Sequence, residues 1–186
     1  MIKILQGSCL DKLKELPDQS INTCITSPPY WGLRDYGTAE WEGGDENCDH
    51  LVGRFERPVS EKQKSNKASA GHQAKTICPK CGAVRKDKQL GMENTPEEFV
   101  DNLVEVFREV KRVLRDDGTV WLNLGDSFLS NKQLGCIPFK VAIALQQDNW
   151  ILRQDIIWHK PNPMPESVRD RCTKAHEYIF LLTKRS

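Results

Sequence analysis

The chain has 186 residues, of which 38% are hydrophobic and 28% charged, so it is long enough for one core and an insertion. No apolar run approaches the ~20 residues of a membrane helix and no signal peptide opens the chain, so we expect a cytoplasmic protein. The seven cysteines are an odd count, which fits a reducing compartment and a metal site better than a disulfide framework.

The net charge of +1 conceals a basic middle segment. Residues 51–90 carry 10 basic and 3 acidic side chains, whereas the rest of the chain carries 17 basic and 23 acidic ones. Such a segment indicates a polyanionic partner. A charge run is more often only a solvated face, so the asymmetry alone does not identify that partner.

The first elements are short. Residues 3–5 are predicted as a strand, and Ser8 is predicted to cap a helix that ends before Pro17. Residues 21–26 are predicted as the next strand. Its carboxyl end is the side on which ligands bind in open α/β sheets.

That strand leads into Ser27-Pro28-Pro29-Tyr30-Trp31. Two consecutive prolines fix φ near −65° and remove two backbone donors, so the chain must leave the sheet in a rigid turn. The Ser27 side chain and the Pro28 carbonyl can accept the hydrogens of an exocyclic amino group while the base stacks on Tyr30. Pro-Pro-Tyr also occurs in segments that bind WW domains, but such segments rarely follow a buried strand.

The stretch from residue 32 to 91 lacks periodic apolar spacing, and residues 40–91 are predicted to be an inserted, basic loop region. It contains Cys-x-x-Cys-Gly at residues 78–82, the spacing of a zinc knuckle. Cys48 and His50 complete a set of four candidate ligands with Cys78 and Cys81, which predicts a structural zinc ion with no open position for chemistry. A redox cysteine pair and unpaired surface thiols are the alternatives.

The second half of the chain has stronger signals. Thr95, Pro96 and Glu98 predict a helix start, and the apolar period continues to Asp117-Gly118. Further elements are predicted as strands at 119–124, 152–158 and 178–183 and a helix at about 137–147. This alternation predicts an α/β fold with a doubly wound sheet.

The order of these motifs resembles that of the β-class DNA amino-methyltransferases, especially phage and bacterial ones with a zinc-binding insertion. The resemblance rests on Ser-Pro-Pro-Tyr-Trp, on Arg-Val-Leu-Arg-Asp-Asp-Gly at residues 112–118, on the strand at 121–125 and on Trp-His-Lys-Pro-Asn-Pro-Met-Pro-Glu at 158–166. It spans nearly the whole chain, as one catalytic domain over 1–186, and implies a bacterial or phage-infected host cell.

The resemblance implies a Rossmann-like fold of the S-adenosylmethionine-dependent methyltransferase type. It also implies double-stranded DNA as substrate, base flipping, and direct methyl transfer from S-adenosylmethionine without a covalent intermediate. Because the Ser form of the turn is more often seen in cytosine-N4 enzymes, it favours cytosine N4 over adenine N6.

The candidate site residues follow from the residue pattern and the resemblance together. Ser8 stands where many relatives have Asp near the cofactor, and Asp126 has helix capping as its simpler alternative role. We expect catalytic roles for Ser27, Pro28, Pro29 and Tyr30, cofactor contacts from Ser8, Asn123 and Asp126, and DNA contacts from Trp31, Lys86, Lys160, Arg169 and Arg171.

Relatives of this class place a donor-binding Phe-x-Gly-x-Gly loop after the catalytic half, and none of the 12 glycines here forms Gly-x-Gly. The chain is therefore expected to be a catalytic half, with the donor loop supplied by a further segment or a separate chain. An inactive remnant that binds DNA through its zinc insertion is one alternative, and a zinc-stabilised nucleic-acid adaptor without methyltransferase ancestry is another. A homodimer, a partner nuclease and the recognised DNA sequence are left open.

Overall fold

The computed structural model describes residues 2–34, 36, 38–50, 77–87 and 89–186. The chain forms two compact units. Unit 1 comprises Met1–Pro28, Val100–Asp126 and Cys136–Ser186, and unit 2 comprises Pro29–Phe99 and Ser127–Gly135. The boundary between the units falls between Pro28 and Pro29, inside the turn that the sequence predicts to be catalytic.

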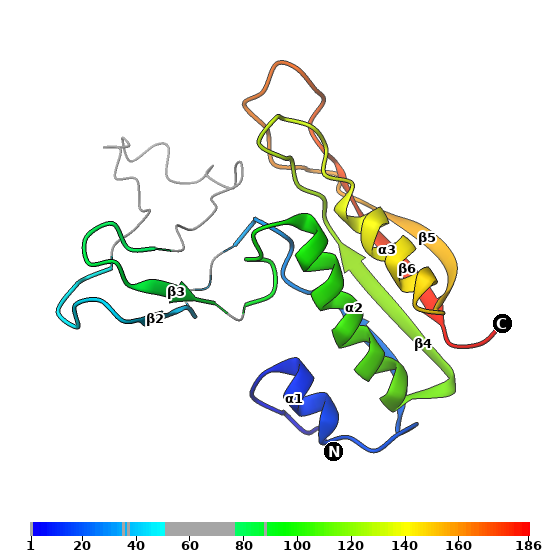
Figure 1. Cartoon of the computed structure of the whole chain (residues 1–186). Coiled ribbons are helices and arrows are strands. Elements are labelled where there is room, and N and C mark those ends of the chain that lie inside the picture. Colours follow the sequence, from blue (N-terminus) through cyan, green and yellow to red (C-terminus); the bar gives the residue numbers. More distant parts are fainter. Residues whose placement is uncertain (1, 35, 37, 51–76, 88) are drawn as a thin grey trace. The chain divides into compact units, whose positions relative to one another are not determined.

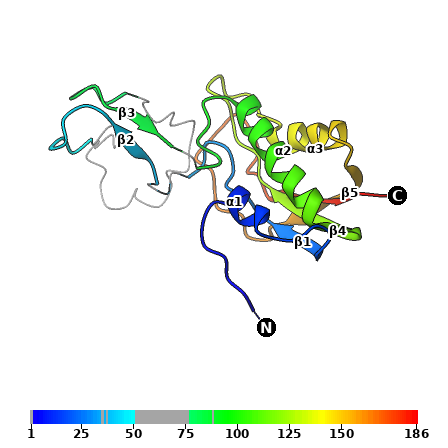
Figure 2. The same ribbon diagram turned by 60° about the horizontal axis from the view of Figure 1, so that its bottom comes forward.

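Unit 1 is built on a four-stranded sheet of order β1-β4-β6-β5 (Figures 1 and 2). The strands are β1 (Ile21–Thr26), β4 (Leu114–Leu124), β6 (His176–Thr183) and β5 (Ile151–His159). β1 runs parallel to β4, and β6 runs antiparallel to both β4 and β5. β1, β4 and β5 therefore point the same way, and their carboxyl ends meet at one edge of the sheet.

Helices α2 (Pro96–Val113) and α3 (Ile137–Gln147) lie over the same face of this sheet (Figures 1 and 2). Alternate residues of β4 are fully buried, as expected for a strand with one face against helices. In the described part of the chain neither of these helices covers the opposite face, which we call the open face, and Ile25 on β1 is 78% exposed. The core of unit 1 contains Leu103, Phe107, Val120, Leu122, Val141, Leu145, Phe180 and Leu182.

The predicted start of α2 is confirmed, and its end is corrected. The Glu98 amide donates to Thr95 Oγ1 at 3.1 Å, as in a capping box. The Glu98 carboxylate accepts from the amide of Asn94, whereas a capping box would use the amide of Thr95. The helix stops at Val113 instead of Asp117-Gly118. Its last carbonyls accept amide hydrogens from residues 19 and 20, so the chain passes directly into β4.

The predictions for the amino-terminal residues are only partly confirmed. Ser8 precedes helix α1 (Cys9–Lys14), but its side chain makes no capping hydrogen bond. Residues 3–5 are not a strand. Ile2 and Ile4 are almost fully exposed, so the apolar alternation has no sheet to pack against.

Unit 2 contains a second, two-stranded sheet. β2 (Glu40–Glu42) pairs antiparallel with β3 (Val84–Lys86), so that Trp41 lies opposite Arg85. The region predicted to be an irregular insertion thus holds short strands, which three-residue segments without alternation do not reveal. Residues 51–76, which carry much of the predicted basic charge, lie outside the described residues. Within the described residues, no helix is both long and apolar enough to cross a membrane.

Candidate active site and metal cluster

The carboxyl edge of the unit 1 sheet brings several predicted site residues together. Ser27 follows β1 directly, Asp126 follows β4 by two residues, and Lys160 follows β5 directly. Because these three strands are parallel, the three residues leave the sheet at the same edge. Ser27 is exposed there. This edge is the candidate active-site edge.

Glu177, at the start of β6, connects two of the predicted residues. Its carboxylate forms an ion pair with the Lys160 ammonium and accepts a hydrogen bond of 3.2 Å from Asn123 Nδ2. The sequence reasoning missed Glu177. An acidic residue opening an otherwise apolar strand was the available signal, but its partners depend on β6 lying between β4 and β5.

Asp126 has a structural role that the sequence reasoning had left open. Its Oδ1 accepts a hydrogen bond of 3.0 Å from the backbone amide of Ile137, the first residue of α3. A carboxylate at this position also lies favourably with respect to the helix dipole. Asp126 therefore caps α3 from the end of β4.

A second group of polar side chains at this edge was also missed. The Lys174 ammonium lies 5.4 Å from the centre of the Tyr178 ring, and the Tyr178 hydroxyl lies 3.1 Å from His176 Nε2. Lys174 Nζ is buried and has no hydrogen-bond partner among the described residues. Burial lowers the pKa of Lys174, although the nearby Asp126 carboxylate opposes this shift.

The two predicted arginines differ in their surroundings. Arg169 is exposed on the loop between β5 and β6. Arg171 instead pairs with Glu166 at 2.9 Å, and the same carboxylate accepts the Lys174 amide at 3.3 Å. Arg171 thus stabilises its own loop, whereas the Arg169 side chain is exposed to solvent.

Ser8, one of the predicted cofactor contacts, is exposed. It precedes α1, whose end is held by Arg112 in the last turn of α2. The Arg112 guanidinium donates to the carbonyls of Leu13 and Leu16 at 2.9 and 3.0 Å. The carboxyl end of α1 therefore lies against the last turn of α2.

In unit 2, the remainder of the proline turn is anchored to residues 91–93. The Trp31 indole donates to the Glu93 carbonyl at 3.0 Å, and the Gly32 amide donates to the Gly91 carbonyl at 2.8 Å. Pro29, Tyr30 and Trp31 are half-buried. The polar edge of Trp31 is therefore used in holding the turn.

The four predicted metal ligands lie together in unit 2. The ligand atoms of Cys48, His50, Cys78 and Cys81 are all within 4.8 Å of one another. Two of the separations are 3.9 Å, between the Cys48 and Cys78 sulfurs, and 3.5 Å, between the Cys81 sulfur and His50 Nδ1. Ligands bonded to zinc at about 2.1–2.3 Å in a tetrahedron stand roughly 3.5–3.8 Å apart. The donor set and its spacing fit a tetrahedral zinc ion.

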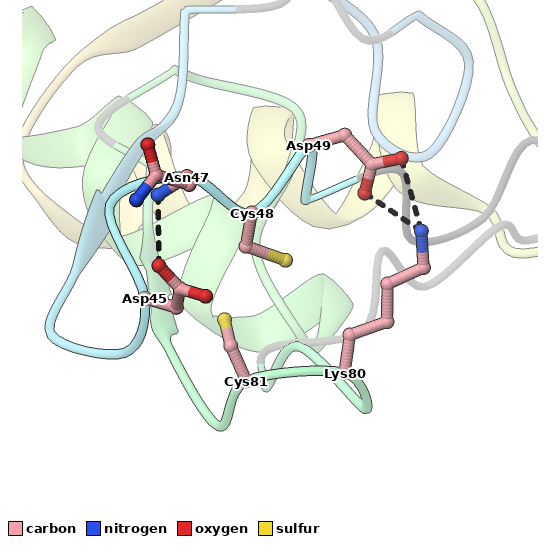
Figure 3. A pocket seen from close by; sticks show the side chains of 6 residues that line it. All are labelled: Asp45, Asn47, Cys48, Asp49, Lys80 and Cys81. Carbon is pink, nitrogen blue, oxygen red and sulfur yellow. Dashed lines mark hydrogen bonds and ion pairs between the residues drawn. The ribbon is translucent and has the colours of Figure 1, made fainter.

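The backbone around the cluster is arranged as a metal knuckle requires. Backbone hydrogen bonds from Asp45 and Ala83 lower the pKa of the Cys81 thiol to about 6, which favours the thiolate that binds metals. The Trp41 ring stacks on His50, with centroids 4.9 Å apart and an interplanar angle of 14°. Figure 3 shows the sulfurs of Cys48 and Cys81 pointing into the same pocket.

The described basic side chains of this insertion are paired with carboxylates. Lys80 contacts Asp49 at 2.7 Å (Figure 3), and Lys86, the predicted DNA contact, lies 3.4 Å from Glu42. The basic excess of the insertion is therefore concentrated in residues 51–76, which hold 6 basic and 2 acidic side chains.

The fold is that of S-adenosylmethionine-dependent methyltransferases. PvuII DNA methyltransferase (cytosine-N4-specific) superposes with a TM-score of 0.59 at 16% identity, covering 96% of this chain and 47% of that one. TTHA0409 of Thermus thermophilus, solved in complex with S-adenosyl-L-methionine, superposes with a TM-score of 0.56 at 21% identity, covering 97% and 54%. At these identities the likeness concerns the fold alone.

The chain belongs to the DNA methylase family of the N6/N4 type, whose signature matches residues 21–186. It is 40% identical to the type II methyltransferase M.SfiI of Streptomyces fimbriatus, over 96% of this chain and 35% of the relative. It is 34% identical to M.Cfr9I of Citrobacter freundii, over 97% and 54%. The chain thus spans about half or less of the length of these relatives.

Proposed function

We propose that the chain is the catalytic half of a DNA methyltransferase that methylates an exocyclic amino nitrogen, with cytosine N4 favoured over adenine N6. The observation that carries the proposal is the position of Ser27-Pro28. This segment leaves β1 at the edge where Asp126 and Lys160 also emerge. The family membership supports the same reaction.

In this proposal the proline turn prepares the target amine. The Ser27 hydroxyl and the Pro28 carbonyl accept the two amino hydrogens, and Tyr30 stacks on the flipped base. These contacts direct the nitrogen lone pair away from the ring and out of conjugation. S-adenosylmethionine, when bound, supplies the electrophilic methyl group.

Asn123 is the residue of this chain best suited to contact the donor. Its Oδ1 is buried and has no hydrogen-bond partner among the described residues, while its Nδ2 is held by Glu177. A buried acceptor of this kind requires a donor group, because leaving it unpaired costs about 1–3 kcal/mol. The amino groups of S-adenosylmethionine are donors of the required type. Asp126 is the second candidate contact.

Double-stranded DNA is the proposed substrate. Lys160 and Arg169 lie on the loop at the candidate active-site edge, where cations can contact the phosphates that flank a flipped base. The basic residues of 51–76 add a sequence-independent contribution to binding.

We further propose that the donor-binding loop comes from a further segment or a separate chain, which covers the open face of the unit 1 sheet. Ile25 on that face is 78% exposed, and in register beside it lies Trp121. Among the described residues β1 pairs with β4 alone, so its other edge can accept an added strand. The greater length of the relatives supports this arrangement.

Zinc is proposed as a structural ion of unit 2, bound by Cys48, His50, Cys78 and Cys81. With four protein ligands it has no position for substrate, so it stabilises the insertion and takes no part in methyl transfer. The ion would contribute folding free energy that two three-residue strands cannot supply.

The test is methyl transfer from radiolabelled S-adenosylmethionine to DNA by the complete gene product, with Ser27→Ala and Tyr30→Ala as controls. Label in DNA that both variants abolish supports the proposal. DNA binding without label transfer, from zinc-loaded protein that contains the donor loop, would instead support the alternative of an inactive, zinc-stabilised DNA-binding module.

A further inference from the structure

Two segments that flank residues 51–76 of the insertion contact each other, and one of them begins in the proline turn. We define the outgoing segment as residues 29–50 and the return segment as residues 77–93. The two are joined near their tips by the pairing of β2 with β3, where Glu40, Trp41 and Glu42 lie opposite Lys86, Arg85 and Val84. The candidate metal ligands lie beyond this pairing, and the proline turn lies before it.

Contacts between the two segments continue from β2 and β3 toward the turn. Gln89 on the return segment accepts a hydrogen bond of 2.8 Å from the Tyr36 amide and donates one of 2.7 Å to the Arg34 carbonyl. Its side chain therefore bridges the outgoing segment at two points, in place of strand pairing.

The contacts end at the turn itself. The Gly91 carbonyl accepts the Gly32 amide at 2.8 Å, and the Glu93 carbonyl accepts the Trp31 indole at 3.0 Å. The Glu93 carboxylate in turn accepts the Gly91 amide at 2.8 Å, which fixes the shape of the return segment at this point.

The return segment approaches the turn closely at Gly91. It is buried and has φ of +91°, a conformation that other residues rarely adopt. A Cβ atom at this position would lie 2.9 Å from the Tyr30 carbonyl oxygen and 3.3 Å from Pro29 Cβ. Only glycine allows the return segment to support the turn from this distance.

A metal ion would join the two segments at their far end. Cys48 and His50 belong to the outgoing segment, whereas Cys78 and Cys81 belong to the return segment. Trp41 on β2 stacks on His50, so the ligand set is also packed against the first strand. Without such a crosslink a two-stranded sheet of this size is marginally stable in water.

We propose that the return segment positions Pro29, Tyr30 and Trp31 through Gly91 and Glu93, and that metal binding at the four-ligand cluster keeps the return segment in place. The inference rests on the proposed function for its catalytic meaning. The zinc ion is then a remote support of the target-base site, and Gly91 and Glu93 are positioning residues.

The experiment follows the Trp31 indole N–H by NMR in ¹⁵N-tryptophan-labelled chain loaded with ZnCl₂, with the resonance assigned from Trp31→Phe. Removing zinc with a chelator is expected to accelerate solvent exchange of this hydrogen by ~10-fold or more, because the segment loses its structural protection. Trp150, which is 3% exposed in the core of unit 1, should keep its resonance and so report that unit 1 stays folded.

Gly91→Ala supplies the second measurement, with Gly43→Ala as matched control. Gly43 also has positive φ, +74°, but has no atoms within 4 Å of an added Cβ. Gly91→Ala should shift the Trp31 indole resonance with zinc still bound, and in the complete methyltransferase it should lower kcat at least ~10-fold. Gly43→Ala should do neither.

An indole exchange rate that zinc removal does not change would overturn the coupling to the metal cluster, and an indole resonance that Gly91→Ala does not shift would overturn the positioning role of Gly91. The indole measurement needs no activity, so its outcome is distinguishable from that of the proposed function. A response at Trp31 in a protein that methylates no DNA would support the coupling while rejecting the methyltransferase.

Discussion

Asn123 on β4 donates a hydrogen bond of 3.2 Å to Glu177 on β6. The same carboxylate holds the Lys160 ammonium at the end of β5. One acidic side chain therefore orients a candidate donor contact and a candidate DNA contact at the carboxyl edge of the sheet. We therefore expect the loss of the Glu177 carboxylate to lower the rate of methyl transfer more than it lowers the free energy of unfolding.

Glu177→Gln tests this role. The Glu177 and Lys160 side chains are 20% and 41% exposed, so solvent screens the pair and we expect the free energy of unfolding to fall by at most about 1 kcal/mol. Because Lys160 loses its partner, methyl transfer by the complete enzyme should fall at least ~10-fold. Urea denaturation and initial rates measure the two effects.

Glu109→Gln is the matched control, since Glu109 pairs with Arg112 at 3.0 Å with similar exposure near the opposite edge of the sheet. It should cost a similar stability and leave the rate unchanged. Equal rates for both variants would contradict the role given to Glu177.

Leu122→Ala and Ile25→Ala compare the two faces of the sheet. Leu122 is fully buried against the helices, so its truncation should cost about 2–5 kcal/mol. Ile25 lies on the open face, and its truncation should cost under about 0.5 kcal/mol in this chain. In the complete methyltransferase Ile25→Ala should cost more, because the proposed further segment covers it. An unchanged cost in chemical denaturation of the complete enzyme would count against that covering.

Cys81→Ser tests the metal cluster. Purified chain should contain one zinc ion, and the variant should contain none, because a hydroxyl replaces one of four ligands. Cys172→Ser should keep the ion, since Cys172 is exposed and outside the cluster. Metal analysis by mass spectrometry reads the result. Metal-free wild-type protein with unit 2 still folded would exclude the zinc assignment.

The lowered pKa of Cys81 predicts a pH dependence in the metal-free chain. Backbone hydrogen bonds hold this pKa at about 6 in the folded state, whereas an unfolded thiol titrates at about 8.5. A lowered folded-state pKa stabilises the fold fully above the unfolded value, and the stabilisation disappears as the pH falls through about 6. Thermal unfolding of unit 2 should therefore shift upward between pH 6 and 8.5. Cys81→Ser should remove that part of the slope.

Arg169→Gln should weaken DNA binding and reduce the slope of log Kd against log salt by about 1, as expected for one lost phosphate contact. Arg115→Gln is the control, because Arg115 pairs with Asp117 near the start of β4. Lys86→Ala should change the slope less than Arg169→Gln, since Glu42 lies 3.4 Å from Lys86. Fluorescence anisotropy over a salt series measures all three. Identical slopes for Arg169→Gln and wild type would remove Arg169 from the interface.

The sequence predicted those elements whose limits are set by local chemistry. β1 ends where Pro28 and Pro29 remove backbone donors, and the predicted limits of β1 and of α3 are confirmed. The spacing of two short motifs likewise predicted four candidate metal ligands, and their ligand atoms lie together in the structure. The strand predicted at residues 3–5 is absent, because an alternating apolar pattern does not by itself provide a neighbouring strand with which to pair.

The residues that the sequence did not reveal depend on strand order. Glu177 meets Asn123 and Lys160 only because β6 lies between β4 and β5, and this order is set by long-range pairing. The role of Gly91 likewise depends on a long-range contact, because Gly91 lies against the backbone of Tyr30, which is far from it in the sequence. Periodicity and short motifs carry no information about such contacts.

Mass analysis of nucleosides from the DNA of cells that express the complete gene product is the direct test of amino-methyl transfer. We expect N4-methylcytosine in these cells and none in cells that express the Ser27→Ala variant at the same level. N6-methyladenine would correct the base while keeping amino-methyl transfer. DNA with no methylated nucleoside above the Ser27→Ala background, from cells holding folded and zinc-loaded protein, would exclude amino-methyl transfer by this protein.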